Sequence, residues 1–117
     1  MKTNNIRKAG FTLVEIMIVV AIIALLAAIA IPNFVKARSV SQKSACIANL
    51  KQIEGAKANW AMEMKKANTD TPAPTELFGT TLYIRVTPTC PGGGTYDVTQ
   101  VDLHPTCTLG TSDGHTL

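Results

Sequence analysis

The feature that most constrains this chain is an apolar run from Phe11 to Ile31, FTLVEIMIVVAIIALLAAIAI. Between Ile16 and Ile31 the run contains no polar side chain. As an α-helix it would be about 31 Å long at roughly 1.5 Å per residue, close to the hydrocarbon thickness of a bilayer. A soluble helix that is apolar on every face needs a large protein around it, and 117 residues make a single-domain length. We therefore expect a helix that spans a membrane or is buried among copies of itself.

Composition and charge exclude several classes of protein. Hydrophobic residues make up 46% and charged residues 16% of the chain, which is too apolar and too weakly charged for a disordered protein. The net charge of +3 comes from Lys2, Arg7 and Lys8, because the acidic and basic side chains of the rest of the chain balance. A surplus confined to one end is not the basic face that binds nucleic acid, so we expect no nucleic-acid partner. Basic residues before the apolar run favour a cytoplasmic amino terminus.

One residue of the run, Glu15, does not fit a passive membrane anchor. A carboxylate deep in a bilayer costs on the order of 2.5–3.5 kcal/mol, and less near the edge. The carboxylate either reaches the lipid headgroups or pairs with a cation, and no Lys or Arg lies within the run. A functional role for Glu15 therefore requires a cation from elsewhere.

The residues around Glu15 form a known pattern. In order, the chain contains basic residues, Gly10, Phe11, the segment Thr-Leu-Val-Glu, a long apolar run and Pro32. This segment resembles the leader and cleavage site of type IV pilins and of the related pseudopilins of type II secretion. The resemblance implies that residues 1–10 are a leader, which a membrane prepilin peptidase removes by cutting between Gly10 and Phe11. It also implies that the same enzyme methylates the new amino group of Phe11.

The resemblance also implies a mode of assembly. Glu15 would pair with the terminal amine of a neighbouring subunit, and the helix near Pro32 would loosen within the filament. The implied partners are further copies of the chain in a homo-oligomeric filament, the prepilin peptidase, the inner membrane and the assembly machinery. The precursor would be a single-pass protein of the bacterial inner membrane with its amino terminus in the cytoplasm, and the filament would be extracytoplasmic. The residues do not identify the machine as one for secretion, motility or DNA uptake.

The remainder of the chain predicts a spine and a small head. Cys46, Leu50, Ile53, Trp60 and Met64 recur at the spacing of one helical face. No strong terminator separates this stretch from the apolar run, so we predict one long helix from Phe11 to about Lys66, bent near Pro32. The predicted domains are a leader (1–10), a transmembrane or filament-core helix (11–35), an amphipathic spine (36–67) and a head (68–117).

The head shows a β pattern. Residues 95–98 and 101–109 alternate in the manner of strands, and the apolar phase changes at Thr99-Gln100, which predicts a turn or bulge there. The predicted fold class is therefore α+β, with a long bent amino-terminal helix and a small antiparallel hairpin or sheet packed on it.

The three cysteines allow three disulfide pairings. The tripeptide Pro-Thr-Cys ends at both Cys90 and Cys107, so in an oxidising compartment we expect these two to pair and Cys46 to remain a free thiol on the buried helix face. Cys90, Cys107, His104 and His115 are suitable metal ligands, but their spacing matches no zinc signature. We expect both histidines on the surface, and neither a metal nor another cofactor.

No catalytic constellation is present in the sequence. We find neither a Ser/His/Asp set nor paired carboxylates at helical spacing, and so expect no catalytic residues, no small-molecule substrate and no enzyme. The predicted function is that of a structural subunit of a filament. Two alternatives remain: a single-pass membrane anchor with a small extracytoplasmic redox or metal-binding head, and a secreted domain released after Ala30. Amino-terminal sequencing of the mature protein separates the three.

Overall fold

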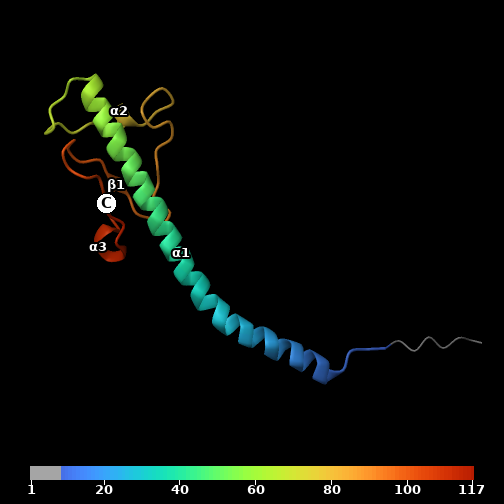
Figure 1. Cartoon of the computed structure of the whole chain (residues 1–117). Helices are drawn as coiled ribbons and strands as arrows, with labels where there is room; N and C mark the ends of the chain where they lie inside the picture. Colours follow the sequence, from blue (N-terminus) through green and yellow to red (C-terminus); the bar gives the residue numbers. More distant parts are fainter. Residues whose placement is uncertain (1–8) are drawn as a thin grey trace, which may run out of the picture. The chain divides into compact units, whose positions relative to one another are not determined.

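The structure is a computed structural model that describes residues 9–117 (Figure 1). Most of the predicted leader, with Lys2, Arg7 and Lys8, lies outside the described residues. The described chain falls into two units, the first ending at Lys36 and the second covering Ala37–Leu117, and each is considered by itself. The elements are α1 (Leu13–Glu63), α2 (Pro74–Leu77), β1 (Tyr96–Asp97), β2 (Thr106–Cys107) and α3 (Gly110–Asp113). The predicted α+β fold, with a long amino-terminal helix and a small antiparallel sheet, is confirmed.

The first unit is the apolar part of α1. All its large apolar side chains from Leu13 to Val35 are more than half exposed. Among the described residues, α1 is the one helix long and apolar enough to cross a membrane, judged by its length and composition. The helix continues through Pro32, which has no N–H to donate to the carbonyl of Ala28. The apolar surface has no cover within the unit and needs lipid or other chains, while the bend expected at Pro32 stays a prediction.

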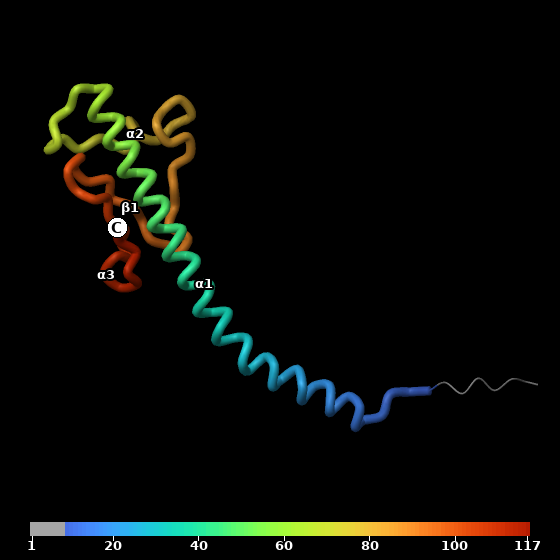
Figure 2. Tube along the Cα trace, in the orientation of Figure 1, coloured from blue at the N-terminus to red at the C-terminus, as the bar shows by residue number. Residues whose placement is uncertain are grey.

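The second unit is built on the carboxyl-terminal half of α1. The chain after Glu63 folds back along this half of the helix (Figure 2). Cys46, Leu50, Ile53 and Trp60 are buried as the periodicity predicts. Met64 is 57% exposed, contrary to the prediction, because α1 ends at Glu63 and the helical phase is lost. The main core combines side chains of α1 with others of the head, namely Ile53, Ala56, Trp60, Ala61, Leu77, Ile84 and Val98.

The hairpin is shorter than its sequence pattern predicted. β1 and β2 are antiparallel, with Tyr96 opposite Cys107 and Asp97 opposite Thr106. Between them Thr99 adopts a left-handed backbone with φ 56°, where a turn or bulge was expected. The expected second strand from 101 to 109 is largely absent. The carbonyl of Leu103, and that of Gln100 just before the expected strand, accept from a lysine side chain of α1 instead of pairing with a neighbouring strand.

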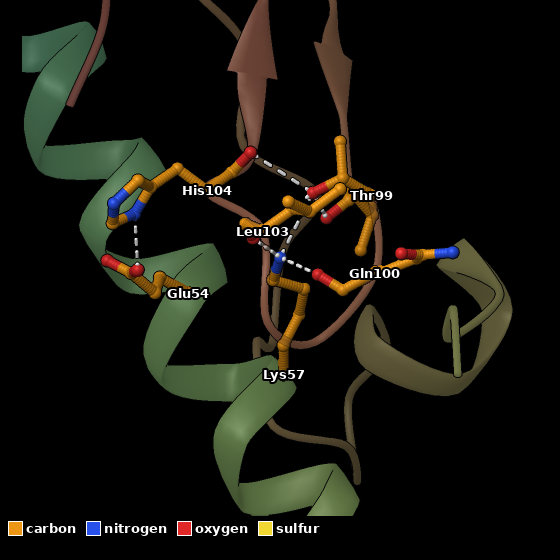
Figure 3. A network of polar contacts seen from close by, with 7 residues as sticks. Glu54, Lys57, Thr99, Gln100, Leu103 and His104 are labelled. Carbon is orange, nitrogen blue, oxygen red and sulfur yellow. Dashed lines mark hydrogen bonds and ion pairs between the residues drawn. The ribbon is translucent and has the colours of Figure 1, made fainter. Parts of the chain in front are cut away.

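That lysine, Lys57, is buried and holds the loop between the strands (Figure 3). Its Nζ donates to the carbonyl oxygens of Gln100 at 2.7 Å and Leu103 at 2.6 Å, and to Oγ1 of Thr99 at 3.1 Å. Burial lowers the pKa of Lys57, although nearby carboxylates, with Glu54 first, oppose this shift. The ammonium group is the closest donor to both carbonyls. Each also accepts a longer hydrogen bond, Gln100 from the N–H of Leu103 at 3.2 Å and Leu103 from Oγ1 of Thr99 at 3.3 Å.

A second polar contact fixes the same loop from outside. Nδ1 of His104 lies 2.6 Å from Oε1 of Glu54, which precedes Lys57 by one helical turn (Figure 3). The side chain of His104 is 70% exposed, so this histidine lies on the surface as predicted. An exposed pair of this kind contributes little to stability. The buried ammonium is therefore the more important contact of the two.

Replacing Lys57 with Met is expected to lower the free energy of unfolding by about 1–3 kcal/mol, because the carbonyls of Gln100 and Leu103 each lose a short hydrogen bond from a charged donor. Lys51→Met is the matched control, since Lys51 is exposed on the same helix, and we expect it to change the stability by less than about 0.5 kcal/mol. Urea unfolding of the full chain in detergent micelles measures both. Equal effects of the two substitutions would contradict the assignment.

Candidate functional site

The predicted cleavage bond lies in an exposed segment. Gly10 and Phe11 precede α1 outside any helix or strand, and Phe11 is 86% exposed. A Cβ built at Gly10 would meet no atom within 4 Å. The bond between these two residues therefore lies in an exposed, non-helical part of the described chain.

Glu15 has a local partner that the sequence analysis missed. The backbone N–H of Thr12 donates to Oε2 of Glu15 at 3.1 Å, and the N–H of Glu15 donates to Oγ1 of Thr12 at 3.2 Å. This reciprocal pair is a capping box, which satisfies two amides at the start of a helix. The signal was present in the sequence as Thr-x-x-Glu at residues 12–15. In the chain with an intact Gly10–Phe11 bond, the carboxylate thus caps its own helix and has no cationic partner in the first unit's described residues.

A second candidate site lies in the head, where four side chains converge. We call Cys46, Cys90, Cys107 and His115 the cysteine–histidine cluster; all four are buried, and their sulfur and ring nitrogen atoms lie within 4.8 Å of one another. Sγ of Cys90 is 3.4 Å from Nδ1 of His115. The expectation that His115 is a surface residue is wrong, since it is 4% exposed. The left-handed backbone of Gly114, with φ 69°, turns the chain after α3 at this point.

The cluster draws its members from separate segments. α1 supplies Cys46, β2 supplies Cys107, and the residues after α3 supply His115. The loop with Cys90 is tied to α1, because Nδ2 of Asn49 donates to the carbonyl of Thr89 at 3.2 Å. Because its members lie far apart along the chain, their proximity could not be predicted from the sequence.

The structure changes the expected set of possible metal ligands and leaves the expected disulfide a prediction. Cys46 joins the cluster in place of His104, which lies apart and contacts Glu54. All three cysteines belong to the described residues and are free thiols there. The disulfide between Cys90 and Cys107 stays a prediction, since the two sulfurs lie close together but unbonded.

The electrostatics of the cluster are uneven. Burial disfavours the Cys90 thiolate, but the backbone amides of Gly94 and Gly92, together with His115, lower its pKa to about 6. Burial raises the pKa of Cys46 to about 12, against the effect of a hydrogen bond with Tyr96. The pKa of Cys90 is thus lowered and that of Cys46 is raised, so the two neighbouring sulfurs differ in how readily they ionise.

Comparison with known proteins concerns mainly the amino-terminal segment. Residues 5–31 match the family model of the prokaryotic N-terminal methylation motif. The chain is 52% identical over 59 residues to the type IV major pilin protein PilA of Myxococcus xanthus (strain DK1622), and 46% identical over 59 residues to the type IV major fimbrial protein FimA of Dichelobacter nodosus.

These similarities cover part of each protein. The matched segment is 50% of this chain, but 27% of the length of PilA and 37% of the length of FimA. No solved structure matches the chain significantly. The chain thus spans between a quarter and two fifths of the curated relatives it matches.

Removing the cap hydroxyl with Thr12→Ala is expected to weaken the first turn of α1 by about 1 kcal/mol. Hydrogen exchange of the amides of residues 13–16 should then be about fivefold faster in detergent micelles. Thr12→Ser retains the hydroxyl and is the matched control. Unchanged exchange in Thr12→Ala would contradict the capping role.

Proposed function

Because the chain belongs to the type IV pilin family by its amino-terminal methylation motif and its similarity to two type IV pilins, we propose that it is the structural subunit of a type IV pilus-like or secretion pseudopilus filament. The observation that carries the proposal is the uncovered apolar half of α1, with Glu15 in its first turn and an exposed Gly10–Phe11 bond before it. Lipid covers this surface in the precursor, and neighbouring subunits cover it in the filament.

Cleavage of the precursor adds a positive charge to the site around Glu15. Cleavage after Gly10 creates an α-amine on Phe11, whose reference pKa is near 7.7–8.0, so it carries a positive charge in much of the population at neutral pH. N-methylation leaves the amine protonatable. Before cleavage the carboxylate of Glu15 caps α1. After cleavage it can pair with the positively charged α-amine of Phe11 on an adjacent subunit.

The main effect of the pair of amine and carboxylate is on the axial register between neighbouring helices. Two charges buried together are less costly than either alone, but such a pair is not automatically a net gain in stability. One axial offset between neighbouring helices brings the Phe11 amine to the Glu15 carboxylate, and other offsets leave both charges unpaired. The pairing therefore selects the axial step of the filament.

Pro32 has a separate role in the proposal. Its missing N–H leaves the carbonyl of Ala28 without the usual helical donor, in a segment that assembly removes from water. The helix is accordingly weakest one turn before Pro32. Local loosening there gives packed helices room to adjust to one another.

The proposed route begins in the bacterial inner membrane. The precursor spans it once with a cytoplasmic amino terminus, in keeping with the basic residues before the apolar run. The prepilin peptidase and the assembly machinery are the proposed partners, and the chain itself performs no catalysis. The second unit, residues 37–117, would lie outside the membrane.

Processing is tested with Gly10→Val. A side chain at this position clashes with no described atom, so the substitution should leave the fold intact while blocking the peptidase. We expect the wild-type protein in purified filaments to begin at methylated Phe11 by mass spectrometry, and the variant to accumulate uncut in the membrane. Filaments built from the uncut chain would refute the proposal.

The role of Glu15 is tested by Glu15→Gln, which removes the charge but keeps the shape and the capping ability of the side chain. We expect normal membrane insertion and cleavage but at least a tenfold loss of filaments in a sheared-fibre assay. Glu15→Asp retains the charge on a shorter side chain and should recover part of the assembly. Normal filament yield from Glu15→Gln would eliminate the pairing.

A further inference from the structure

We propose that the cysteine–histidine cluster is a structural zinc site, with Cys46, Cys90, Cys107 and His115 as its four ligands. The proposal goes beyond filament formation and does not depend on it. It rests on the position of the ligand atoms, on the glycines around them and on the burial of all four side chains.

The first argument is the geometry of the ligand atoms. Zinc bonds of about 2.3 Å to sulfur and about 2.0–2.1 Å to nitrogen in a tetrahedron separate the ligand atoms by roughly 3.5–3.8 Å. The distance from Sγ of Cys90 to Nδ1 of His115 is 3.4 Å, and no pair in the cluster exceeds 4.8 Å. Small side-chain rotations bring all four atoms to one ion. Three cysteines and one histidine form one of the common structural zinc sets.

The second argument comes from the glycine-rich loop after Cys90. A Cβ built on Gly94 would lie 2.8 Å from Sγ of Cys107, and one on Gly92 would lie 3.1 Å from Cε1 of His115. Both positions therefore exclude side chains at the surface of the cluster. The backbone amides of the same two glycines favour the charged form of Cys90 and lower its pKa, and the charged form is the one that binds a metal.

The third argument is that a disulfide explains less of the arrangement. A bond between Cys90 and Cys107 uses two sulfurs about 2.0 Å apart and leaves the buried thiol of Cys46 and the imidazole of His115 without a purpose. Zinc uses all four groups. On binding, the thiols lose their protons to solvent, and the ion replaces them as the shared partner of the three sulfurs.

The ligand set also identifies the ion and its role. Thiolates with one imidazole in a tetrahedral arrangement favour zinc over magnesium, calcium or manganese. Four protein ligands leave no open position for water or substrate, so the ion is structural. It would join α1, the glycine-rich loop, β2 and the residues after α3 around a single centre.

The test uses the full chain, purified in detergent micelles without oxygen and without added metal, chelator or thiol reductant. We expect one zinc ion per chain by elemental analysis, and three titratable thiols after denaturation. Replacement with Co²⁺ should give the intense visible bands of tetrahedral cobalt and a thiolate charge-transfer band. Zinc removal by a chelator should lower the Tm, and zinc addition should restore it.

Variants separate ligands from bystanders. Cys46→Ser and His115→Ala should each weaken zinc binding by about 100-fold or more, whereas His104→Ala, in the exposed histidine, should retain one zinc per chain. His115→Cys supplies a fourth thiolate and should restore binding with an altered cobalt spectrum. Gly94→Ala should weaken binding by about tenfold, because its methyl group crowds Cys107.

The opposite result is equally clear. A Cys90–Cys107 disulfide with one free thiol and no stoichiometric metal in the anaerobically purified chain would overturn the zinc site. Cobalt that shows no charge-transfer band with the wild-type chain would also overturn it, even if a variant failed to fold.

Discussion

The uncovered apolar surface of α1 is the constraint on which the rest of the molecule depends. From Leu13 to Val35 every large apolar side chain is mostly exposed, and burial of such area is the main favourable term in folding and association. The surface therefore requires lipid or other protein at all times. Since the same helix continues into the head, the element that requires this cover also carries the buried face of the globular unit.

The head combines a small apolar core with two buried polar centres. Leu77, Ile84 and Val98 cover Ile53 and Trp60, and little else is available in so short a chain. Lys57 ties the loop between the strands to α1, and the cysteine–histidine cluster brings Cys90, Cys107 and His115 to Cys46 of the same helix. Specific polar contacts thus hold loops that have few apolar side chains of their own.

The sequence was sufficient for features that depend on local periodicity. The apolar run, the stripe from Cys46 to Trp60 and the turn near Thr99 all follow from spacing within a few residues. Met64 was misplaced because the end of α1 depends on the local backbone beyond Glu63, where periodicity carries no information. The short strands have a tertiary cause instead, because Lys57 of α1 competes for the backbone oxygens of Gln100 and Leu103.

The two candidate sites differ in the same respect, since one is local in the sequence and the other joins distant segments. The residues expected to act in cleavage and pairing, Gly10, Phe11 and Glu15, lie together in one short motif, while Pro32 lies outside it. The motif also contains the capping box of Thr12 and Glu15. The cluster in the head joins residues from four segments, and its histidine was expected on the surface. The expectation of no metal rested on spacing along the chain, which says nothing about distances created by folding.

The burial of Lys57 has a consequence for the chemical reactivity of the protein. Its amine is enclosed and already donates to three oxygens, whereas Lys43, Lys51 and Lys65 are open to solvent. Reagents that acylate primary amines will therefore modify the open lysines first and reach Lys57 after the loop has detached from α1. The order of acylation therefore reports how often the loop between the strands detaches from α1 in the purified chain.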